Sequence, residues 1–240
     1  MYSNLVFPAQ NNRPFFFINA VQTVDGKTQV THNRDSYWPI GSEYDYKTML
    51  KLRLYADVLI HGKNTAICQH TLDNLGKEDF QQKRKKHGKT RKILYLIVSA
   101  NPTEELLDFL INPSEGTDPL LVTTSKTHLS SKLSNAVKII RMGNDKVDML
   151  LLAKYLHSKN YRNVLVEGGS ILWSSFFACN LVDEIFITVA PKIFGDKTNE
   201  TLSLISDCLF PPDKIRRLKL LSAKKHRDEV YLHYRVITER

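Results

Sequence analysis

The residues best suited to chemistry stand together at Glu167, Gly168 and Gly169. The apolar segment 163–166 before them is typical of a strand, and an apolar helix is expected to begin at about Ser170. Glycines at such a turn let a ligand approach the main chain, and the amides at a helix start attract phosphate. A carboxylate beside such a turn suits a site for a hydroxylated substrate and a nucleotide cofactor. The spacing fits a plain tight turn with a solvated glutamate equally well.

Strands and helices alternate along the chain. Apolar runs predict strands at 15–21, 57–62, 93–99, 120–123, 163–166 and 184–190, and a final hairpin made by 218–222 and 230–236. Helices are expected after a cap at Ser42, with Asp45 three residues on, and at 103–111 and 148–157. This order indicates an α/β protein, with a mostly parallel mixed sheet, flanking helices and a C-terminal antiparallel hairpin. Glu167, Gly62 and Ser99 stand at carboxyl ends of strands, where such sheets place active sites.

The composition is that of an ordinary globular protein. With 240 residues and no Pro/Gly/Ser-rich linker, the sequence predicts a single domain over residues 1–240. No apolar run approaches the roughly 18 residues of a membrane span, and no secretory signal is evident at the N-terminus. Three widely separated cysteines predict neither a disulfide framework nor a metal site, and they favour a reducing, cytoplasmic location.

The net charge of +9 is concentrated in one run. Residues 83–92 hold seven Lys or Arg and no Asp or Glu, which leaves only +2 for the rest of the chain. The run has no interleaved aromatic residues for base stacking. A mobile, solvated loop is therefore favoured over a nucleic-acid-binding arm. The run could also help to attract an anionic substrate.

Three separate blocks of residues, each present once, carry recognisable patterns along the chain. The first, 166–195, contains Glu-Gly-Gly, Leu-Val-Asp-Glu and Ala-Pro…Phe-Gly elements. The second joins Arg-Pro-Phe at 13–15 to Thr-Val-Asp-Gly-Lys at 23–27. The third runs from Ser-Tyr-Trp at 36–38 through Leu-Arg at 52–53 and Ala-Asp at 56–57 to Gly62 and Thr65. Together they resemble the pyrimidine reductases of riboflavin biosynthesis, which have a dihydrofolate-reductase-like fold, over nearly the whole chain.

The resemblance implies a reductase that transfers a hydride from NADPH to C1′ of the ribosylamino group on a phosphorylated aminopyrimidine, opening the sugar into a ribityl chain. It places Ser36, Arg53 and Glu167 against the substrate. The planar fork of Arg53 suits the 5′-phosphate, although a surface helix arginine would fit the same place. The implied cofactor-binding residues are Val21 (main chain only), Trp38, Gly62, Thr65, Ser99, Gly168, Gly169 and Ser170. Trp38 would equally suit a core aromatic residue.

Two departures from the family pattern leave the substrate open. Fused bacterial enzymes often carry lysine at the position of Asn19, whereas stand-alone archaeal reductases commonly carry asparagine. The undeaminated diaminopyrimidine, on which those archaeal enzymes act, is therefore the first expectation for the substrate. Without the lysine, the catalytic proton donor is unassigned. After Thr65 the usual Asp-Asp-Pro segment is missing, and Asp73 would have to replace it. A reductase of the same fold with another substrate is therefore the alternative. A third hypothesis is a nucleic-acid- or partner-binding protein that uses Lys83–Lys92.

Two signatures are absent from the sequence. The zinc-deaminase pattern His-x-Glu…Pro-Cys-x-x-Cys does not occur, so no deaminase domain is expected. The G-x-G-x-x-G fingerprint is also missing, so NADPH would have to bind through the Gly-Gly helix start. The resemblance further implies a homodimer, whose interface would need an apolar surface strand or helix.

Overall fold

The computed structural model describes residues 1–2, 5–30, 40–68, 72–111, 115–197 and 200–237. The chain forms two compact units, and each is described by itself. The first unit comprises Met1–Phe7, Phe15–Leu52 and Val166–Arg240, and the second comprises Pro8–Pro14 and Arg53–Leu165. Whether the chain acts as one reductase domain stays a prediction.

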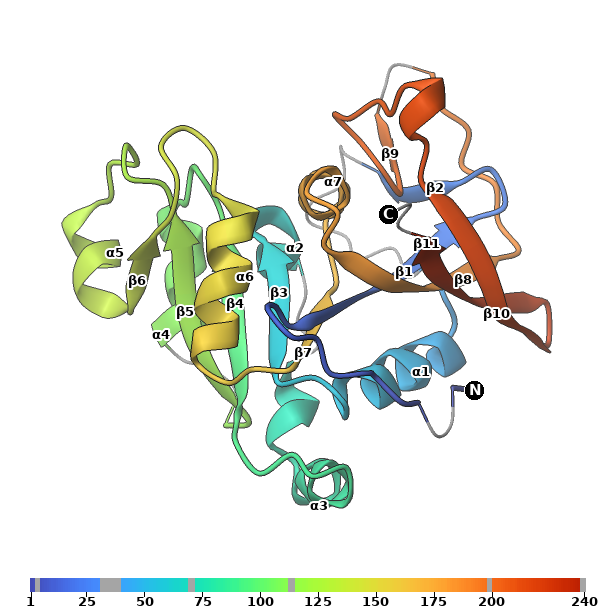
Figure 1. The fold of residues 1–240 in the computed structure, drawn as a ribbon, viewed down its shortest axis with the longest axis horizontal. Helices are drawn as coiled ribbons and strands as arrows, with labels where there is room; N and C mark the ends of the chain where they lie inside the picture. The colour runs from blue at the N-terminus through green and yellow to red at the C-terminus, as the bar shows by residue number, and fades with distance from the viewer. Residues whose placement is uncertain (3–4, 31–39, 69–71, 112–114, 198–199, 238–240) are drawn as a thin grey trace. The chain divides into compact units, whose positions relative to one another are not determined.

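The first unit is built on a mixed sheet in the order β10-β11-β8-β1. Its strands are β1 (Phe15–Thr23), β8 (Val182–Ala190), β10 (Arg217–His226) and β11 (Glu229–Ile237). β1 and β8 run parallel, while β11 is antiparallel to both β8 and β10. Two helices, α1 (Glu43–Arg53) and α7 (Ser170–Ala178), and a small pair formed by β2 (Lys27–Val30) and β9 (Thr201–Ser203) complete it, with the short turn η3 (Pro212–Lys214) before β10 (Figure 1).

The second unit carries a sheet in the order β7-β3-β4-β5-β6. Its strands are β3 (Val58–Gly62), β4 (Ile93–Val98), β5 (Thr117–Thr123), β6 (Ile139–Arg141) and β7 (Asn163–Val166). The pairs β3/β4, β4/β5 and β5/β6 are all parallel. Every residue of β4 is buried, which explains its continuous apolar run. The helical elements are α2 (Lys63–Cys68), η1 (Asp73–Gly76), α3 (Glu78–Lys86), η2 (Glu104–Leu106), α4 (Leu107–Ile111), α5 (Ser131–Ala136) and α6 (Met149–Ser158).

The strands and helices expected from the apolar patterns are all present, with small differences at their ends. The two predicted helix starts have the expected caps. The Ser42 hydroxyl accepts hydrogen bonds from the amides of Tyr44 and Asp45 at 3.2 and 3.3 Å. The Asp148 carboxylate accepts from the first amides of α6. The mostly parallel α/β architecture with a C-terminal antiparallel hairpin is therefore confirmed. No helix among the described residues is long and apolar enough to cross a membrane.

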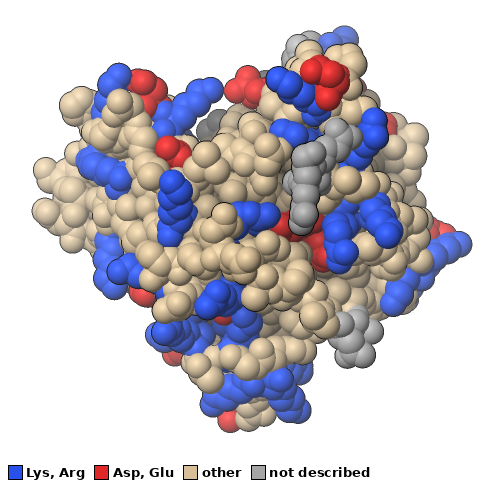
Figure 2. Space-filling model, viewed as in Figure 1, with Lys and Arg blue, Asp and Glu red and all other residues tan. Residues whose placement is uncertain are grey.

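The prediction that residues 83–92 form a mobile, solvated loop is wrong for the first part of the run. Between β3 and β4 the chain forms α2, η1 and α3, and the basic run begins inside α3. Arg84 is buried, with 1% of its surface exposed, and donates to the carbonyls of Arg53, Ala56 and Arg91 at 3.0, 2.8 and 3.2 Å. Lys89 pairs with Asp57 at 2.7 Å. Part of the run therefore holds the second unit together, and other lysines cover its surface around α3 (Figure 2).

Candidate functional site

The Glu-Gly-Gly turn lies between β7 and α7. Gly168 has a φ of 119°, a conformation that only glycine adopts readily. Gly169 is the N-cap of α7 and contributes no side-chain cap. The Trp173 indole donates to the Val166 carbonyl at 3.0 Å and so ties α7 to the residue before the turn. Glu167 is only 6% exposed, so the alternative of a solvated glutamate is wrong.

The start of α7 has the properties of an anion-binding site. Its first turn has no side-chain cap, and the Ser170 side chain is buried. The Ser170 Oγ has no hydrogen-bond partner among the described residues. A buried hydroxyl without a partner costs free energy unless a ligand or water satisfies it. Together with the partial positive charge of a helix N-terminus, these groups suit the oxygens of a bound phosphate.

The Thr-Val-Asp-Gly-Lys turn and the Phe-Gly element are joined by hydrogen bonds. The Asp25 carboxylate accepts from the Thr23 hydroxyl at 2.5 Å and from the Phe194 and Gly195 amides at 3.3 and 2.7 Å. The Thr23 bond is the main reason that the pKa of Asp25 lies below its usual value. Lys27 pairs with Asp196 at 3.2 Å. Two blocks that are far apart in sequence therefore fix each other in the first unit.

The start of α1 is held by a buried carboxylate from β11. Glu229 is 6% exposed and accepts from the amide and the hydroxyl of Ser42 at 2.7 and 2.6 Å. The Tyr231 hydroxyl donates to the same carboxylate at 2.5 Å. Burial and this bond raise the pKa of Tyr231. Glu229 is thus matched by three donors and fixes the helix start against the sheet.

Asp45, in the first turn of α1, is a half-buried carboxyl with an altered proton affinity. Burial is the largest cause that raises its pKa to about 6, and the charges of Glu229 and Glu167 add to it, while a hydrogen bond from the Thr188 hydroxyl opposes the change. Among the described residues no lysine or arginine pairs with Asp45. Val21 is paired with Thr188 across β1 and β8, so a predicted site residue lies beside this group.

The second unit positions four of the predicted site residues. Arg53 is fully buried at the end of α1, so the alternative of a surface arginine is wrong. Gly62 ends β3 in register with the end of β4, which places it at the same sheet edge as Ser99. The Ser99 hydroxyl accepts from the Asn101 amide at 3.1 Å. Thr65 lies half-buried in α2.

The predicted site residues thus fall into two groups. Val21, Glu167, Gly168, Gly169 and Ser170 belong to the first unit, and Arg53, Gly62, Thr65 and Ser99 belong to the second. Ser36 and Trp38 lie outside the described residues. The backbone of Asp73, the proposed replacement after Thr65, begins η1. The functional roles of all these residues stay predictions.

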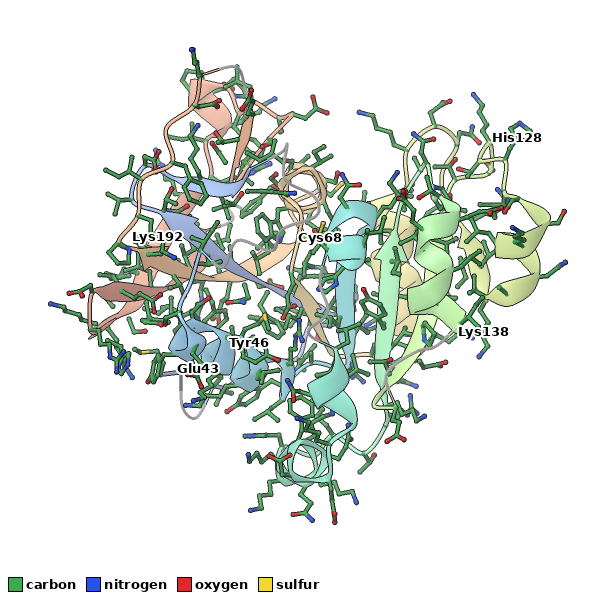
Figure 3. The ribbon with its side chains drawn as sticks, turned by 180° about the vertical axis from the view of Figure 1, so that it is seen from behind. Glu43, Tyr46, Cys68, His128, Lys138 and Lys192 are labelled. Carbon is green, nitrogen blue, oxygen red and sulfur yellow. The ribbon has the colours of Figure 1, made fainter. Side chains whose placement is uncertain are left out.

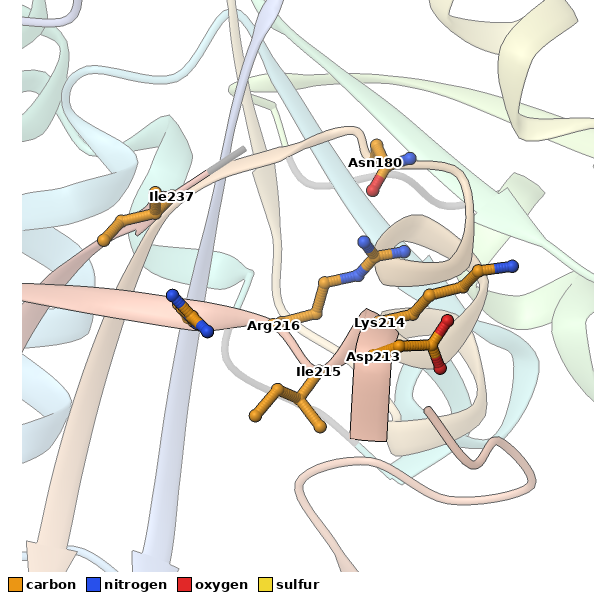
Figure 4. A pocket seen from close by; sticks show the side chains of 7 residues that line it. Asn180, Asp213, Lys214, Ile215, Arg216 and Ile237 are labelled. Atoms are coloured by element: carbon orange, nitrogen blue, oxygen red, sulfur yellow. The ribbon is translucent and has the colours of Figure 1, made fainter. Parts of the chain in front are cut away.

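A surface pocket of about 280 Å³ lies at the far end of α7 from the Gly-Gly turn (Figure 4). It is lined by Asn180, Asp213, Lys214, Ile215, Arg216, Arg217 and Ile237. Since Asn180 follows a nine-residue helix, the pocket is separated from Gly169 by roughly 13 Å along the helix axis. None of the predicted site residues that the structure describes lines it, so the pocket gives no support to the candidate site.

Sequence reasoning missed the contribution of Asp45, Thr188 and Glu229. Asp45 was interpreted as part of a helix cap, and its partners come from strands far along the chain. A sequence signal was nevertheless present, because Glu229 directly precedes the alternating apolar residues of the final strand. Only the register of β8 and β11 shows that these groups meet.

Comparison with known proteins places these features in a family. Residues 14–231 match the model of the RibD C-terminal domain. The chain is 28% identical over 213 residues to the 2,5-diamino-6-ribosylamino-4(3H)-pyrimidinone 5′-phosphate reductase of Archaeoglobus fulgidus, covering 86% of this chain and 94% of that one. The enzyme of the same name from Methanothermobacter thermautotrophicus is 26% identical, covering 79% and 83%.

A solved structure agrees on the fold. The pyrimidine reductase-like protein of Corynebacterium diphtheriae superposes with a TM-score of 0.72 at 21% identity, covering 95% of this chain and 94% of that one. This likeness confirms the mixed α/β fold that the resemblance to pyrimidine reductases implied.

Proposed function

The chain belongs to the RibD C-terminal domain family of pyrimidine reductases, and we propose that it is the reductase that converts 2,5-diamino-6-ribosylamino-4(3H)-pyrimidinone 5′-phosphate to its ribitylamino form. The observation that carries the proposal is the buried Glu167 beside the uncapped start of α7, where the Ser170 hydroxyl has no hydrogen-bond partner among the residues that the structure describes. The archaeal relatives that bear this enzyme name match most of the chain.

The residues of the first unit suit both halves of the reaction. Gly168, Gly169 and Ser170 would hold cofactor phosphate oxygens at the start of α7. Glu167 would accept hydrogen bonds from hydroxyls of the opened sugar and so orient C1′. When bound, NADPH supplies a hydride that adds to C1′ of the imine as the nitrogen gains a proton, which leaves a secondary amine and NADP⁺. NADPH in preference to NADH is part of the proposal.

Arg53 would hold the 5′-phosphate. Arg53 is completely buried and already interacts within the protein, so this role rests on the family pattern and on the bidentate bonds that a guanidinium forms to phosphate oxygens. Thr65 and Ser99 would add hydroxyl groups near the cofactor, and Gly62 would contribute main-chain groups. The roles of Ser36 and Trp38 rest on the family pattern alone.

The proposal is tested by NADPH oxidation with the diaminopyrimidinone phosphate and, separately, with its deaminated counterpart. Turnover of the first is expected. The Glu167→Gln variant should keep its affinity for NADPH and lose about 10- to 100-fold in kcat/KM, since a bond to a charged group is replaced by a neutral one. An unchanged kcat/KM would remove Glu167 from the substrate site. No turnover of either compound, with NADPH still bound, would favour a reductase with another substrate, as the altered segment after Thr65 allows.

We also propose that the protein is a homodimer that pairs through the outer face of β10 and β11. One face of this hairpin is apolar across paired positions: Leu218 with Val236, Leu220 with Tyr234, and Ala223 with Leu232. Leu218 is 39% exposed and Leu220 50%, and β10 is the edge strand of the sheet. An exposed apolar face on an edge strand favours pairing with another chain. A twofold axis would bring the same face of two identical copies together.

Nucleic-acid binding through Lys83–Lys92 is the weaker candidate. Arg84 and Lys89 are engaged in contacts within the second unit, which leaves fewer free cations than the sequence suggested. It predicts salt-sensitive binding of an oligonucleotide that is lost when the exposed lysines are neutralised. The proposed location is the cytoplasm, because the three widely separated cysteines form no disulfide with one another; Figure 3 labels Cys68 at the end of α2.

A further inference from the structure

The position of Asp45 is fixed by its surroundings in the first unit. Its amide is held by the Ser42 cap, which is itself held by Glu229. Gly41 leaves the space in which the carboxyl lies, because a Cβ at Gly41 would come within 2.2 Å of Asp45 Oδ2. The Asp45 carboxyl therefore lies against the main chain at Gly41, a position that a side chain at residue 41 would exclude.

The groups that face Asp45 come from four elements. Thr188 of β8 donates a hydrogen bond to the carboxyl, and Glu229 of β11 and Glu167 at the Gly-Gly turn act on it through their charges. Tyr2, in the N-terminal segment, has its pKa raised by burial and by the charge of Asp45. The hydroxyl of Tyr231 is occupied by Glu229. The groups that act on the Asp45 carboxyl are thus carboxylates and hydroxyls, and among the described residues no lysine or arginine forms an ion pair with it.

A half-buried carboxylate with a single donor has unused hydrogen-bonding capacity. An ionised carboxylate can accept about four hydrogen bonds, and within the described part of the chain only the bond from Thr188 is present. Its electrostatic contact with Glu167 places this capacity near the residue proposed to bind the sugar. A ligand with two adjacent N–H donors would supply the hydrogen bonds that the Asp45 carboxylate can still accept.

We propose that Asp45, supported by Thr188, recognises the pyrimidinone ring and selects the undeaminated substrate. The undeaminated ring presents N3–H and the 2-amino group side by side, two donors that match the two oxygens of a carboxylate. The deaminated ring presents a carbonyl oxygen in place of the amino group, which a carboxylate repels. This inference rests on the proposed function and identifies the specificity-determining residue of the same site.

The test compares both substrates on the wild type and Asp45→Asn. An amide has nearly the same size and presents one acceptor and one donor group, which match N3–H and the 2-carbonyl of the deaminated ring. We expect kcat/KM for the diamino compound to fall about 10- to 100-fold. The value for the deaminated compound should hold or rise, so the preference shrinks or reverses. Glu43→Gln is the matched control, because Glu43 lies on the same turn of α1 and its side chain is exposed; this variant should keep the wild-type preference. Figure 3 labels Glu43 and Tyr46 on this helix.

Two further readouts separate recognition from a structural role. The Kd of the diamino compound without cofactor should rise by a similar factor in Asp45→Asn. In the wild type, kcat/KM for this compound should fall below about pH 6, since protonation removes an acceptor, and this acid limb should be absent from the variant.

Each outcome decides the inference. An equal loss for both substrates, or an unchanged ratio between them, would overturn it while leaving the reductase assignment in place. Failure of the wild type to reduce either compound would overturn the proposed function, and the inference with it. A changed ratio together with a lost acid limb would support the role of Asp45.

Discussion

Replacing Asp45 by asparagine is expected to stabilise the unliganded protein at neutral pH. The carboxyl has a pKa of about 6 in the folded chain against an ordinary value of 3.8, mainly because it is buried. Between these pH values the folded protein holds a proton that the unfolded chain has released. The free energy of unfolding should therefore fall as the pH rises from about 4 to about 6, and the penalty remains at pH 7.

The size of the effect follows from that difference. A pKa change of one unit corresponds to about 1.4 kcal/mol, so the ionised carboxyl costs at most about 3 kcal/mol. Asparagine removes the charge, and its amide oxygen can still accept the Thr188 bond. Part of the gain is lost because the amide N–H₂ must find its own partners. We expect Asp45→Asn to raise the free energy of unfolding at pH 7.5 by about 1–2 kcal/mol.

Urea unfolding followed by circular dichroism at pH 4.5 and pH 7.5 measures the effect. The stabilisation should be small at the lower pH and full at the higher one. Glu43→Gln should not stabilise the protein and should lower the free energy of unfolding slightly at most, because Glu43 forms only an exposed pair with Lys47 at 2.6 Å. A variant at Asp45 that is less stable than the wild type at pH 7.5, or equally shifted at both pH values, would refute the electrostatic reasoning.

Three other substitutions test separate parts of the structure. Arg84→Met should lower the free energy of unfolding by about 2–4 kcal/mol, since three carbonyl partners are left without their donor, while exposed Lys86→Met should change it by less than about 0.5 kcal/mol in the same urea experiment. Gly169→Val should weaken NADPH binding at least about tenfold in a fluorescence titration without unfolding the protein. Leu220→Glu should convert the proposed dimer to a monomer in analytical ultracentrifugation; an unchanged mass would place the interface elsewhere.

Sequence patterns predict the fold well wherever burial is achieved by apolar side chains. β4 is a continuous apolar run because all of its residues are buried, and it was predicted almost to the residue. α3 was missed for the opposite reason. Its inward-facing residues are Phe80 and Arg84, so one of the two buried positions carries a charge and no apolar periodicity is visible. An arginine that binds main-chain carbonyls cannot be distinguished by sequence from its solvated neighbours.

The candidate site divides in the same way. Local geometry needs glycine at 168, and a local pattern therefore shows the turn. Asp45, Thr188 and Glu229 come from α1, β8 and β11, which are far apart along the chain. They meet because β8 lies between β1 and β11, so that Thr188 pairs with Val21 on one side and with Tyr231 on the other. Such cross-strand register is set by the whole sheet and leaves no trace in spacing along the chain.

The buried carboxylates of the first unit differ in how fully they are satisfied, and this difference bears on function. Glu184 contacts His233 at 2.8 Å and Arg235 at 3.2 Å. Glu229 has three donors from Ser42 and Tyr231. These two carboxylates are matched within the fold, as stability requires of buried charge. The half-buried Asp45 differs from them, since within the described residues it has one donor, and it has neighbours of like charge and a stability cost at neutral pH. This contrast, together with the charge of Glu167 that acts on Asp45, is the physical reason for the proposal that Asp45 binds the paired N–H groups of the substrate.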